Sequence, residues 1–411
     1  MKVLQINAVY GYGSTGMIVQ GIHTMLQSGG IESYVAYSLP FDGENEERYK
    51  DFYKIGSAFD RKIHALLSRI GGKQGYFSYF ATKGLLRYIE KIRPDVVHLH
   101  NVHNNYVNVP LLCNFLRKND IATVVTLHDC WYYTGGCYHY SAVKCKKWLC
   151  ECGDCVKRFE DTPAYLVDSS KQILRDRNKF FNAIKRFAAV GVSKWISGEA
   201  GNSLLRNKKV YTVYNGIDTD FFSPVNETFR ERFDLKNKFV ILGFANKCLM
   251  PENRELMERL CALCGEDTAF IIAGCSARKA QSLPEGIIPV EYISDRSVLR
   301  ELYSSCDVFV NCTHEESLSM VNVEAQACGT PVVTYSATGA GETVDGISGF
   351  GIEADDVQGF VDKVQQIRSR GKKEYSEACR SFVLSRFNER VNYSDYLAIY
   401  KEVSDFENKN R

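Results

Sequence analysis

Two glutamates, Glu316 and Glu324, are separated by seven residues in the segment whose residue types point most clearly to chemistry, residues 314–333. The small residues Ser317 and Ser319, with Leu318 between them, let backbone N–H groups approach a ligand. They open a predicted helix, whose N-terminus favours a phosphate. From that helix Glu324 can accept the hydroxyls of a ribose, and Glu316 can accept those of a sugar. Two carboxylates beside a pyrophosphate are expected only where they contact hydroxyls.

A glycine loop follows the first predicted strand. Residues 11–16 read Gly-Tyr-Gly-Ser-Thr-Gly and satisfy G-x-G-x-x-G. Taken alone, this pattern favours a dinucleotide-dependent oxidoreductase, which also needs an acidic residue at the end of the second strand to hold a ribose. The second predicted strand, residues 32–37, and Ser38 directly after it end without one. The loop is therefore a candidate phosphate-binding loop without the rest of the dinucleotide pattern.

Histidines follow two predicted strands of the first half. His128 ends the strand 123–127, where a neutral imidazole can bond a sugar hydroxyl and stabilise developing charge. A core histidine is the alternative. His98, His100 and His103 form H-x-H-x2-H, and alternate residues on a strand face the same side. A metal site there is the minority hypothesis, because no carboxylate completes it.

A cysteine-rich insertion, residues 130–158, is the most unusual feature. Cys137, Cys145, Cys152 and Cys155 give C-x7-C-x6-C-x2-C. Four thiolates within twenty residues suit tetrahedral structural zinc, although the first pair is more widely spaced than a typical zinc half-site. Free thiols and disulfides are the alternatives, and a reducing compartment disfavours the disulfides.

Alternating strand and helix patterns run through both halves of the chain. A chain of 411 residues is too long for one ordinary core and suits two domains. Apolar strands alternating with helices predict doubly wound parallel α/β sheets, which bind ligands at the carboxyl ends of their strands. A turn-rich connector, residues 214–224, separates the halves. The predicted strands are 2–9, 32–37, 95–99, 123–127 and 188–192, then 239–244, 269–273, 290–292, 308–311 and 331–334.

The E-x7-E segment resembles the motif of glycosyltransferase family 4, which comprises retaining enzymes of GT-B fold. Residues 215–218 (NGID), 339–344 and 346–350 resemble further family segments, and all lie in the family's order. Residues 126–155 resemble a bacterial polysaccharide-biosynthesis branch with a cysteine-rich insertion. The resemblance implies two Rossmann-like domains facing a central cleft. Their expected bounds are 1–222 for the acceptor domain and 223–388 for the donor domain, with a C-terminal helix, 389–411, packing back on the first.

The resemblance also implies roles for particular residues. His128 and Glu316 are expected at the transferred sugar. The family has a basic pair for the pyrophosphate, and here only Lys247 and Arg254 are available, neither at the expected position. Without a credible metal-binding D-x-D motif, no catalytic metal is expected. The implied acceptor-cleft residues are Asn101 and His103, and the implied donor-binding residues are Gly13, Gly16, Lys247, Arg254, Ser317, Leu318, Ser319, Glu324 and Glu342.

Charge and hydropathy indicate the compartment. The sequence shows no signal-peptide pattern and no apolar run of about 20 residues, so a cytoplasmic enzyme is expected. Residues 1–225 hold 29 basic against 20 acidic side chains, and residues 52–93 hold nine against two. Together with the amphipathic pattern of residues 57–93, this favours contact with the anionic inner face of the cytoplasmic membrane. A core helix with a solvated basic face is the alternative.

The function implied by the resemblance is retaining transfer of a sugar from a UDP- or GDP-linked donor. The expected acceptor is a hydroxyl of a glycan, polyprenyl-linked as is common in the family, in bacterial surface polysaccharide biosynthesis. Nucleic acid is not an expected partner. A sugar-nucleotide epimerase on the same scaffold and a non-enzymatic sugar-nucleotide-binding subunit are the alternatives.

Overall fold

The computed structural model describes residues 1–39, 52–225, 228–281, 283–284 and 286–405. The chain divides into two compact units, one formed by Met1–Asn215 with the segment that begins at Arg390, the other by Gly216–Glu389. Each is a parallel α/β sheet covered by helices, as predicted. No helix in the described ranges combines the length and hydropathy needed to cross a bilayer.

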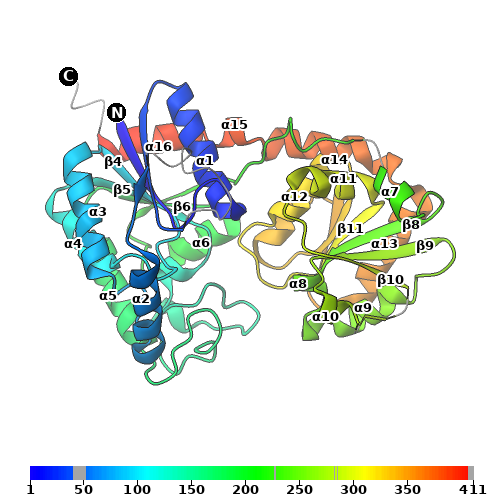
Figure 1. Ribbon diagram of the computed structural model, residues 1–411, viewed down its shortest axis with the longest axis horizontal. Helices are drawn as coiled ribbons and strands as arrows, with labels where there is room; N and C mark the ends of the chain where they lie inside the picture. The colour runs from blue at the N-terminus through cyan, green and yellow to red at the C-terminus, as the bar shows by residue number, and fades with distance from the viewer. Residues whose placement is uncertain (40–51, 226–227, 282, 285, 406–411) are drawn as a thin grey trace. The chain divides into compact units, whose positions relative to one another are not determined.

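Unit 1 has a seven-stranded sheet in the order β3-β2-β1-β4-β5-β6-β7 (Figure 1). Its chain order reverses direction between β1 and β4, which is where doubly wound sheets bind ligands. The strands are β1 Lys2–Ile6, β2 Glu32–Tyr37, β3 Tyr53–Lys54, β4 Val96–Leu99, β5 Ala122–Leu127, β6 Phe187–Gly191 and β7 Lys209–Thr212. The helices are α1 Gly13–Ser28, α2 Ala58–Gly71, α3 Tyr79–Ile92, α4 Val109–Lys118, α5 Ser170–Ala183, α6 Lys194–Asn202 and α16 Asp395–Ser404, with short turns η2 Trp131–Tyr133 and η3 Lys147–Leu149.

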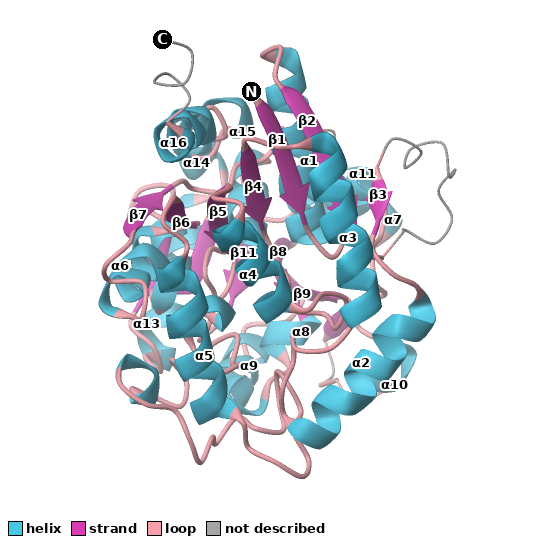
Figure 2. Ribbon diagram, turned by 90° about the vertical axis from the view of Figure 1, so that its left-hand side faces the viewer, coloured by secondary structure: helices cyan, strands magenta, loops and turns pink. Residues whose placement is uncertain are grey.

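The C-terminal helix α16 belongs to the core of unit 1. Apolar side chains of β1, β4, β5 and β6 pack against α1 and α16 on one face of the sheet. Helices α3, α4 and α5 lie on the other side (Figures 1 and 2). The two tyrosines of α16 are buried, and both reach polar groups in the sheet: Tyr400 Oη lies 2.7 Å from His98 Nδ1, and Tyr396 Oη 2.8 Å from Thr126 Oγ1.

Unit 2 has a six-stranded sheet in the order β10-β9-β8-β11-β12-β13, with its reversal between β8 and β11. Helices α9, α13 and α14 contribute to its main core. The strands are β8 Phe239–Phe244, β9 Thr268–Ala273, β10 Ile287–Val290, β11 Val308–Asn311, β12 Val332–Tyr335 and β13 Gly349–Ile352. The helices are α7 Thr228–Arg232, α8 Ala245–Cys248, α9 Arg254–Cys261, α10 Ala277–Ala280, α11 Arg296–Ser305, α12 Met320–Ala327, α13 Val357–Arg370 and α14 Lys373–Arg386, with η4 Pro251–Asn253 and η5 Thr338–Thr343. The short helix α15 Glu389–Asn392 begins at the last residue of unit 2 and continues into unit 1.

The boundary between the units lies at Asn215/Gly216, seven residues before the expected one. The connector belongs to unit 2 because its backbone is bonded there. Ile217 N–H donates to Phe387 O over 2.9 Å, and Glu389 N–H donates to Ile217 O over 3.2 Å. Arg380 donates to the carbonyls of Thr219 and Phe222.

Candidate functional site

The predicted donor-binding residues of unit 2 follow three strands, β8, β11 and β12, at the carboxyl edge of the sheet. Lys247 follows β8, Glu316 to Ser319 follow β11, and Glu342 lies in η5 after β12. Because β8, β11 and β12 are consecutive neighbours in the sheet, their loops meet beside the point where the strand order reverses.

The main chain of Glu316 is clamped by the loop that follows β12. Its N–H donates to Thr338 Oγ1 over 3.0 Å, and its carbonyl accepts from that hydroxyl over 2.7 Å and from Gly339 N–H over 3.0 Å. Thr338 has φ +57°, a left-handed conformation that is unfavourable for a β-branched residue. Its two bonds to Glu316 hold the strained loop in place. Thr338 was not predicted as a site residue, because only this tertiary contact reveals it.

The Glu316 side chain has a carboxylate oxygen whose hydrogen-bonding capacity is unsatisfied by the described residues. Its Oε2 is buried and has no hydrogen-bond partner among the described residues, and the same is true of Ser317 Oγ. A buried polar atom left unsatisfied costs about 1–3 kcal/mol. Two adjacent unsatisfied polar atoms on a loop at the carboxyl edge of the sheet are a feature that a polar ligand would satisfy.

Three backbone N–H groups beside Glu316 are also available. Those of Ser317, Leu318 and Ser319 make no hydrogen bond within the described part of the chain. They lead into α12, whose first turn has no acidic residue and whose N-terminus has no side-chain cap. Ser319 Oγ is instead within 2.7 Å of Asn311 Nδ2. Free N–H groups and the helix dipole together attract a phosphate.

Glu324 lies on α12, partly buried, and accepts a hydrogen bond from Tyr303 Oη over 3.1 Å. Burial raises the pKa of its carboxyl to about 7, against the smaller opposing effects of Tyr303 and the positive charge of Arg296. The carboxyl therefore changes charge close to neutral pH. Its second oxygen, Oε1, has no bond to a described residue and can accept from a ligand.

The two candidate cations differ in environment. Lys247, in α8 directly after β8, is partly buried and forms no ion pair with a described carboxylate. The Arg254 side chain is 84% exposed, and its Nε lies 3.0 Å from Glu258 Oε1. Between them, Asn253 is buried and was not predicted as a site residue. Its Nδ2 donates to Lys247 O and Cys312 O, and its Oδ1 lies 3.0 Å from His314 Nε2, so it joins the β8 and β11 loops.

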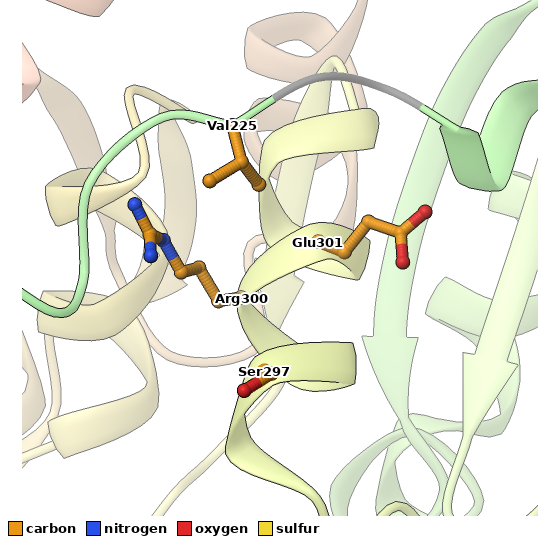
Figure 3. A pocket seen from close by; sticks show the side chains of 4 residues that line it. All are labelled: Val225, Ser297, Arg300 and Glu301. Carbon is orange, nitrogen blue, oxygen red and sulfur yellow. The ribbon is translucent and has the colours of Figure 1, made fainter.

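A separate open pocket of about 530 Å³ in unit 2 contains none of the predicted site residues. It is lined by Val225, Ser297, Arg300 and Glu301, and Figure 3 shows Arg300 and Glu301 pointing in opposite directions from α11. Arg300 Nε donates to Ser223 O over 2.8 Å, and Glu301 pairs with Arg232. These charged groups already have protein partners, which distinguishes the pocket from the Glu316 loop.

Unit 1 brings its predicted residues to the carboxyl edge of β1, β4 and β5. The glycine loop follows β1 and opens α1, whose first turn also lacks an acidic residue. Gly13 has φ +62°, and a Cβ at Gly16 would lie 3.1 Å from Val9 Cγ2 and 3.3 Å from Gly11 N. Glycine is therefore favoured at position 13 by the left-handed backbone conformation and at position 16 by close packing. Asn101, after β4, donates its N–H to Asn7 Oδ1 over 3.1 Å.

A buried chain of hydrogen bonds sets the tautomer of His128, directly after β5. Gln5 Nε2 donates to Val19 O, which leaves Gln5 Oε1 to accept from His100 Nε2–H over 3.1 Å. Burial lowers the pKa of His100 well below its usual value, so its Nδ1 is unprotonated. His128 Nε2, 3.0 Å away, must then donate to it. Burial also lowers the pKa of His128 to about 4, so its Nδ1 is a bare acceptor at neutral pH.

The metal alternative for the three other histidines is not supported. His98 is bonded to Tyr400 and Thr126, His100 to Gln5 and His128, and His103 Nε2 lies 2.9 Å from Asp129 Oδ2. Across the described ranges, no group of three or more His, Cys, Asp or Glu side chains is arranged to hold a metal ion. His103 is buried, and its contact with Asp129 joins the loop after β4 to the loop after β5.

The four predicted zinc ligands of the cysteine-rich insertion lie near enough to influence one another electrostatically. Burial raises the pKa of Cys137 to about 12 and that of Cys152 to about 11, and Cys155 adds to both shifts, which makes these thiols neighbours. Cys145 adds to the shifts of Cys152 and Cys155. All four are free thiols and, among described residues, do not form a closed metal site. Structural zinc therefore stays a prediction.

The zinc prediction has a direct test. If the four sulfurs close around zinc, purified protein should contain about one zinc per chain, and Cys152→Ser with Cys155→Ser should lose it. Elemental analysis measures this, with Cys261→Ser and Cys264→Ser as a matched control pair at the same spacing in unit 2. Metal-free wild-type protein, expressed with zinc in the medium, would contradict the prediction.

Comparisons with known proteins agree with the fold and the order of the loops. The model of Glycosyltransferase Family 4 matches residues 18–221, and that of Glycosyl transferases group 1 matches residues 252–370. The putative colanic acid biosynthesis glycosyl transferase WcaC of Escherichia coli is 21% identical, over 99% of this chain and all of its own length. The capsular polysaccharide biosynthesis glycosyltransferase CapM of Staphylococcus aureus is 26% identical, over 37% of this chain and 43% of its own.

Solved structures show the same fold over nearly the whole chain. Sucrose-phosphate synthase from Thermosynechococcus elongatus superposes with a TM-score of 0.69 at 14% identity, covering 98% of each chain. HepE of Anabaena, in complex with UDP, superposes with a TM-score of 0.66 at 14% identity, covering all of each chain. With both units matched by family models, this chain belongs to glycosyltransferase family 4 and has the GT-B fold.

Proposed function

We propose that this glycosyltransferase uses a nucleotide-sugar donor, UDP- or GDP-linked, and transfers the sugar with retention to a hydroxyl of a polyprenyl-linked glycan. The bond between the sugar C1 and the diphosphate oxygen breaks, and a bond from C1 to the acceptor oxygen forms. The proton of the acceptor hydroxyl passes to the departing diphosphate oxygen, and the nucleoside diphosphate leaves. The product is an extended bacterial surface polysaccharide precursor.

The observation that carries the proposal is the orphaned Oε2 of Glu316 beside the free N–H groups of residues 317–319. A sugar hydroxyl satisfies the carboxylate, and a diphosphate satisfies the N–H groups, so the two halves of a nucleotide sugar fit adjacent parts of one loop. In this proposal Glu324 accepts from the ribose. His128 offers its bare Nδ1 to a sugar hydroxyl. No catalytic metal takes part.

Relatives support the chemistry in two respects. The HepE structures contain UDP and UDP-glucose, which are a diphosphate and a donor of the proposed kind. WcaC and CapM are named for colanic acid and capsular polysaccharide biosynthesis, which supports a surface polysaccharide as the product.

The test begins with the donor. Thermal unfolding of the full chain is measured against UDP, GDP and a panel of their sugars, since a ligand present at 100 times its Kd stabilises the fold by about 2.7 kcal/mol. The nucleotide sugar that shifts the transition is then incubated with short polyprenyl-diphosphate glycans and the products are analysed. A new glycosidic bond supports the proposal. If the donor sugar is epimerised instead, the protein is a sugar-nucleotide epimerase. If the donor binds but is not turned over on any glycan, the protein is a non-enzymatic sugar-nucleotide-binding subunit.

The two candidate cations should differ in how much they contribute to nucleoside diphosphate binding. Lys247→Gln should weaken nucleoside diphosphate binding about tenfold, because Lys247 is partly buried, without an ion pair, and follows β8 directly. Arg254→Gln should change it less than twofold, because this side chain is exposed and paired with Glu258. Calorimetric titration measures both. The reverse ranking would assign the diphosphate to Arg254.

A further inference from the structure

Helix α2 turns its apolar side outwards. Its large apolar residues recur at the spacing of one helical face, and they are exposed, with Phe59 70% and Leu66 58% accessible. The residues that α2 buries are polar, His64 and Ser68. A helix packed on a soluble core shows the reverse arrangement. The exposed residues are Phe59, Ile63, Leu66, Leu67 and Ile70.

Specific polar contacts hold α2 in this orientation. His64 Nε2 accepts from Gly75 N–H over 3.1 Å, which leaves its Nδ1–H to donate to Ser78 Oγ over 2.7 Å. Ser68 Oγ donates to Asn105 Oδ1 over 3.3 Å. The helix is also fixed at its start, where Ser57 and Asp60 form a reciprocal capping box. Rotating α2 to bury its apolar face would break these buried bonds, so the exposure is built into the fold.

The apolar surface continues beyond the helix. Tyr165, Leu166 and Val167 are exposed, Leu166 by 72%. They lie against the last turn of α2, because Tyr165 N–H donates to Arg69 O over 2.7 Å and a Cβ on Gly72 would lie 2.3 Å from Val167 O. We call the five α2 residues together with these three the α2 surface. Helix α2 lies at the periphery of unit 1 in both views (Figures 1 and 2).

Cations border the α2 surface. Lys62 and Arg69 are exposed on one side of the apolar stripe, and the surrounding residues 52–93 hold nine basic and two acidic side chains. Of the two acids, Asp60 is engaged in the capping box, where hydrogen bonds from Ser57 lower its pKa. Exposed cations therefore flank one side of the apolar stripe of α2.

We propose that the α2 surface docks on an anionic lipid bilayer. A bilayer presents negatively charged headgroups above an apolar interior, which matches cations beside a stripe of Phe, Ile and Leu side chains. Contiguous exposed apolar surface of this kind marks an interaction site. This proposal does not depend on the identity of the donor or on catalysis, so it can fail or hold independently of the proposed function.

The experiment is co-sedimentation of the full chain with vesicles of phosphatidylglycerol mixed with phosphatidylcholine, and with vesicles of phosphatidylcholine alone. Wild-type protein should bind the anionic vesicles, less so as salt is added. Leu66→Ser with Ile70→Ser should reduce binding at least tenfold through lost apolar insertion. Lys62→Glu with Arg69→Glu should also reduce binding to the anionic vesicles at least tenfold, since removing a single cation lowers membrane affinity about fivefold.

Matched variants provide the controls. Tyr292→Ser with Ile347→Ser removes two exposed apolar side chains of unit 2, and Lys118→Glu with Lys179→Glu reverses two exposed cations elsewhere in unit 1. Both pairs should bind vesicles like wild type, and all variants should keep their nucleotide affinity. Equal binding by every variant would overturn the proposal. So would sedimentation velocity showing a dimer that Leu66→Ser dissociates, because the occupant would then be a second copy of the chain.

Discussion

Replacing Glu316 by alanine should lower sugar transfer about 100-fold or more while nucleoside diphosphate binding stays within about threefold of wild type. The proposed role of Glu316 is to accept a hydroxyl of the sugar, which the diphosphate lacks. Truncating it removes an electrostatic contact to the transferred group, and such contacts are worth factors of about 10²–10³ in kcat. Product formation and calorimetric titration measure the two quantities.

The stability of this variant provides a second readout. Since Oε2 of Glu316 is buried and has no hydrogen-bond partner among the described residues, its removal also removes the cost of desolvating it. Glu316→Ala should therefore unfold at the same temperature as wild type or slightly higher. Its main-chain bonds to Thr338 and Gly339 remain. If activity falls together with a clear loss of stability, Glu316 serves the fold of the loop and not the sugar.

Thr338 offers the complementary control. Thr338→Val keeps the size and branching of the side chain but cannot bond the main chain of Glu316. Transfer should fall here too, yet with a measurable loss of thermal stability, because a strained left-handed residue loses the bonds that hold it. Comparing the two variants separates the carboxylate that contacts the sugar from the residue that positions it.

The strands of the two sheets were predictable to the extent that they are buried. β2, β8 and β11 have the predicted bounds, and most others differ by one to three residues, because continuous apolar runs mark central strands. The edge strands β3 and β7, and β13 with its two glycines, were missed because short or half-exposed strands lack such a run. β10 carries Pro289 and lies up to three residues earlier than predicted. The C-terminal helix divides into α15 and α16, and its tyrosines are buried in unit 1.

The site shows the same limit. Spacing alone placed Glu316 and Glu324 on a loop and a helix, since both are local in sequence. The partners that give them their properties are distant in sequence: Thr338 clamps Glu316, Tyr303 bonds Glu324, and Gln5 acts on His128 through His100. No local pattern encodes these contacts, because they arise only when strands far apart in sequence become neighbours in the sheet.

Replacing Glu324 by glutamine should raise the stability of the fold and weaken nucleotide binding, and both effects should depend on pH. The pKa of this carboxyl is about 7 in the fold against 4.5 ordinarily. The folded state therefore binds the proton more tightly than the unfolded state. That contribution to stability is complete below about pH 4.5 and is lost as pH rises through 7. Glutamine does not titrate. Glu324→Gln should thus gain stability over wild type between pH 5 and pH 8, by up to about 3 kcal/mol.

Nucleotide binding should move in the opposite direction. A ribose donates its hydroxyls best to the ionised carboxylate, so wild-type affinity for the nucleoside diphosphate should rise as pH increases from 6 to 8. Glu324→Gln should show no such rise and bind about 10- to 100-fold more weakly at pH 8, the magnitude of hydrogen bonds to a charged group. Glu377→Gln, an exposed carboxylate on α14, should change neither property. If the variant is stabilised but its nucleotide affinity is unchanged, the raised pKa of Glu324 is supported and its proposed contact with the ribose is contradicted. Because the two readouts have opposite signs, general damage to the fold cannot produce both.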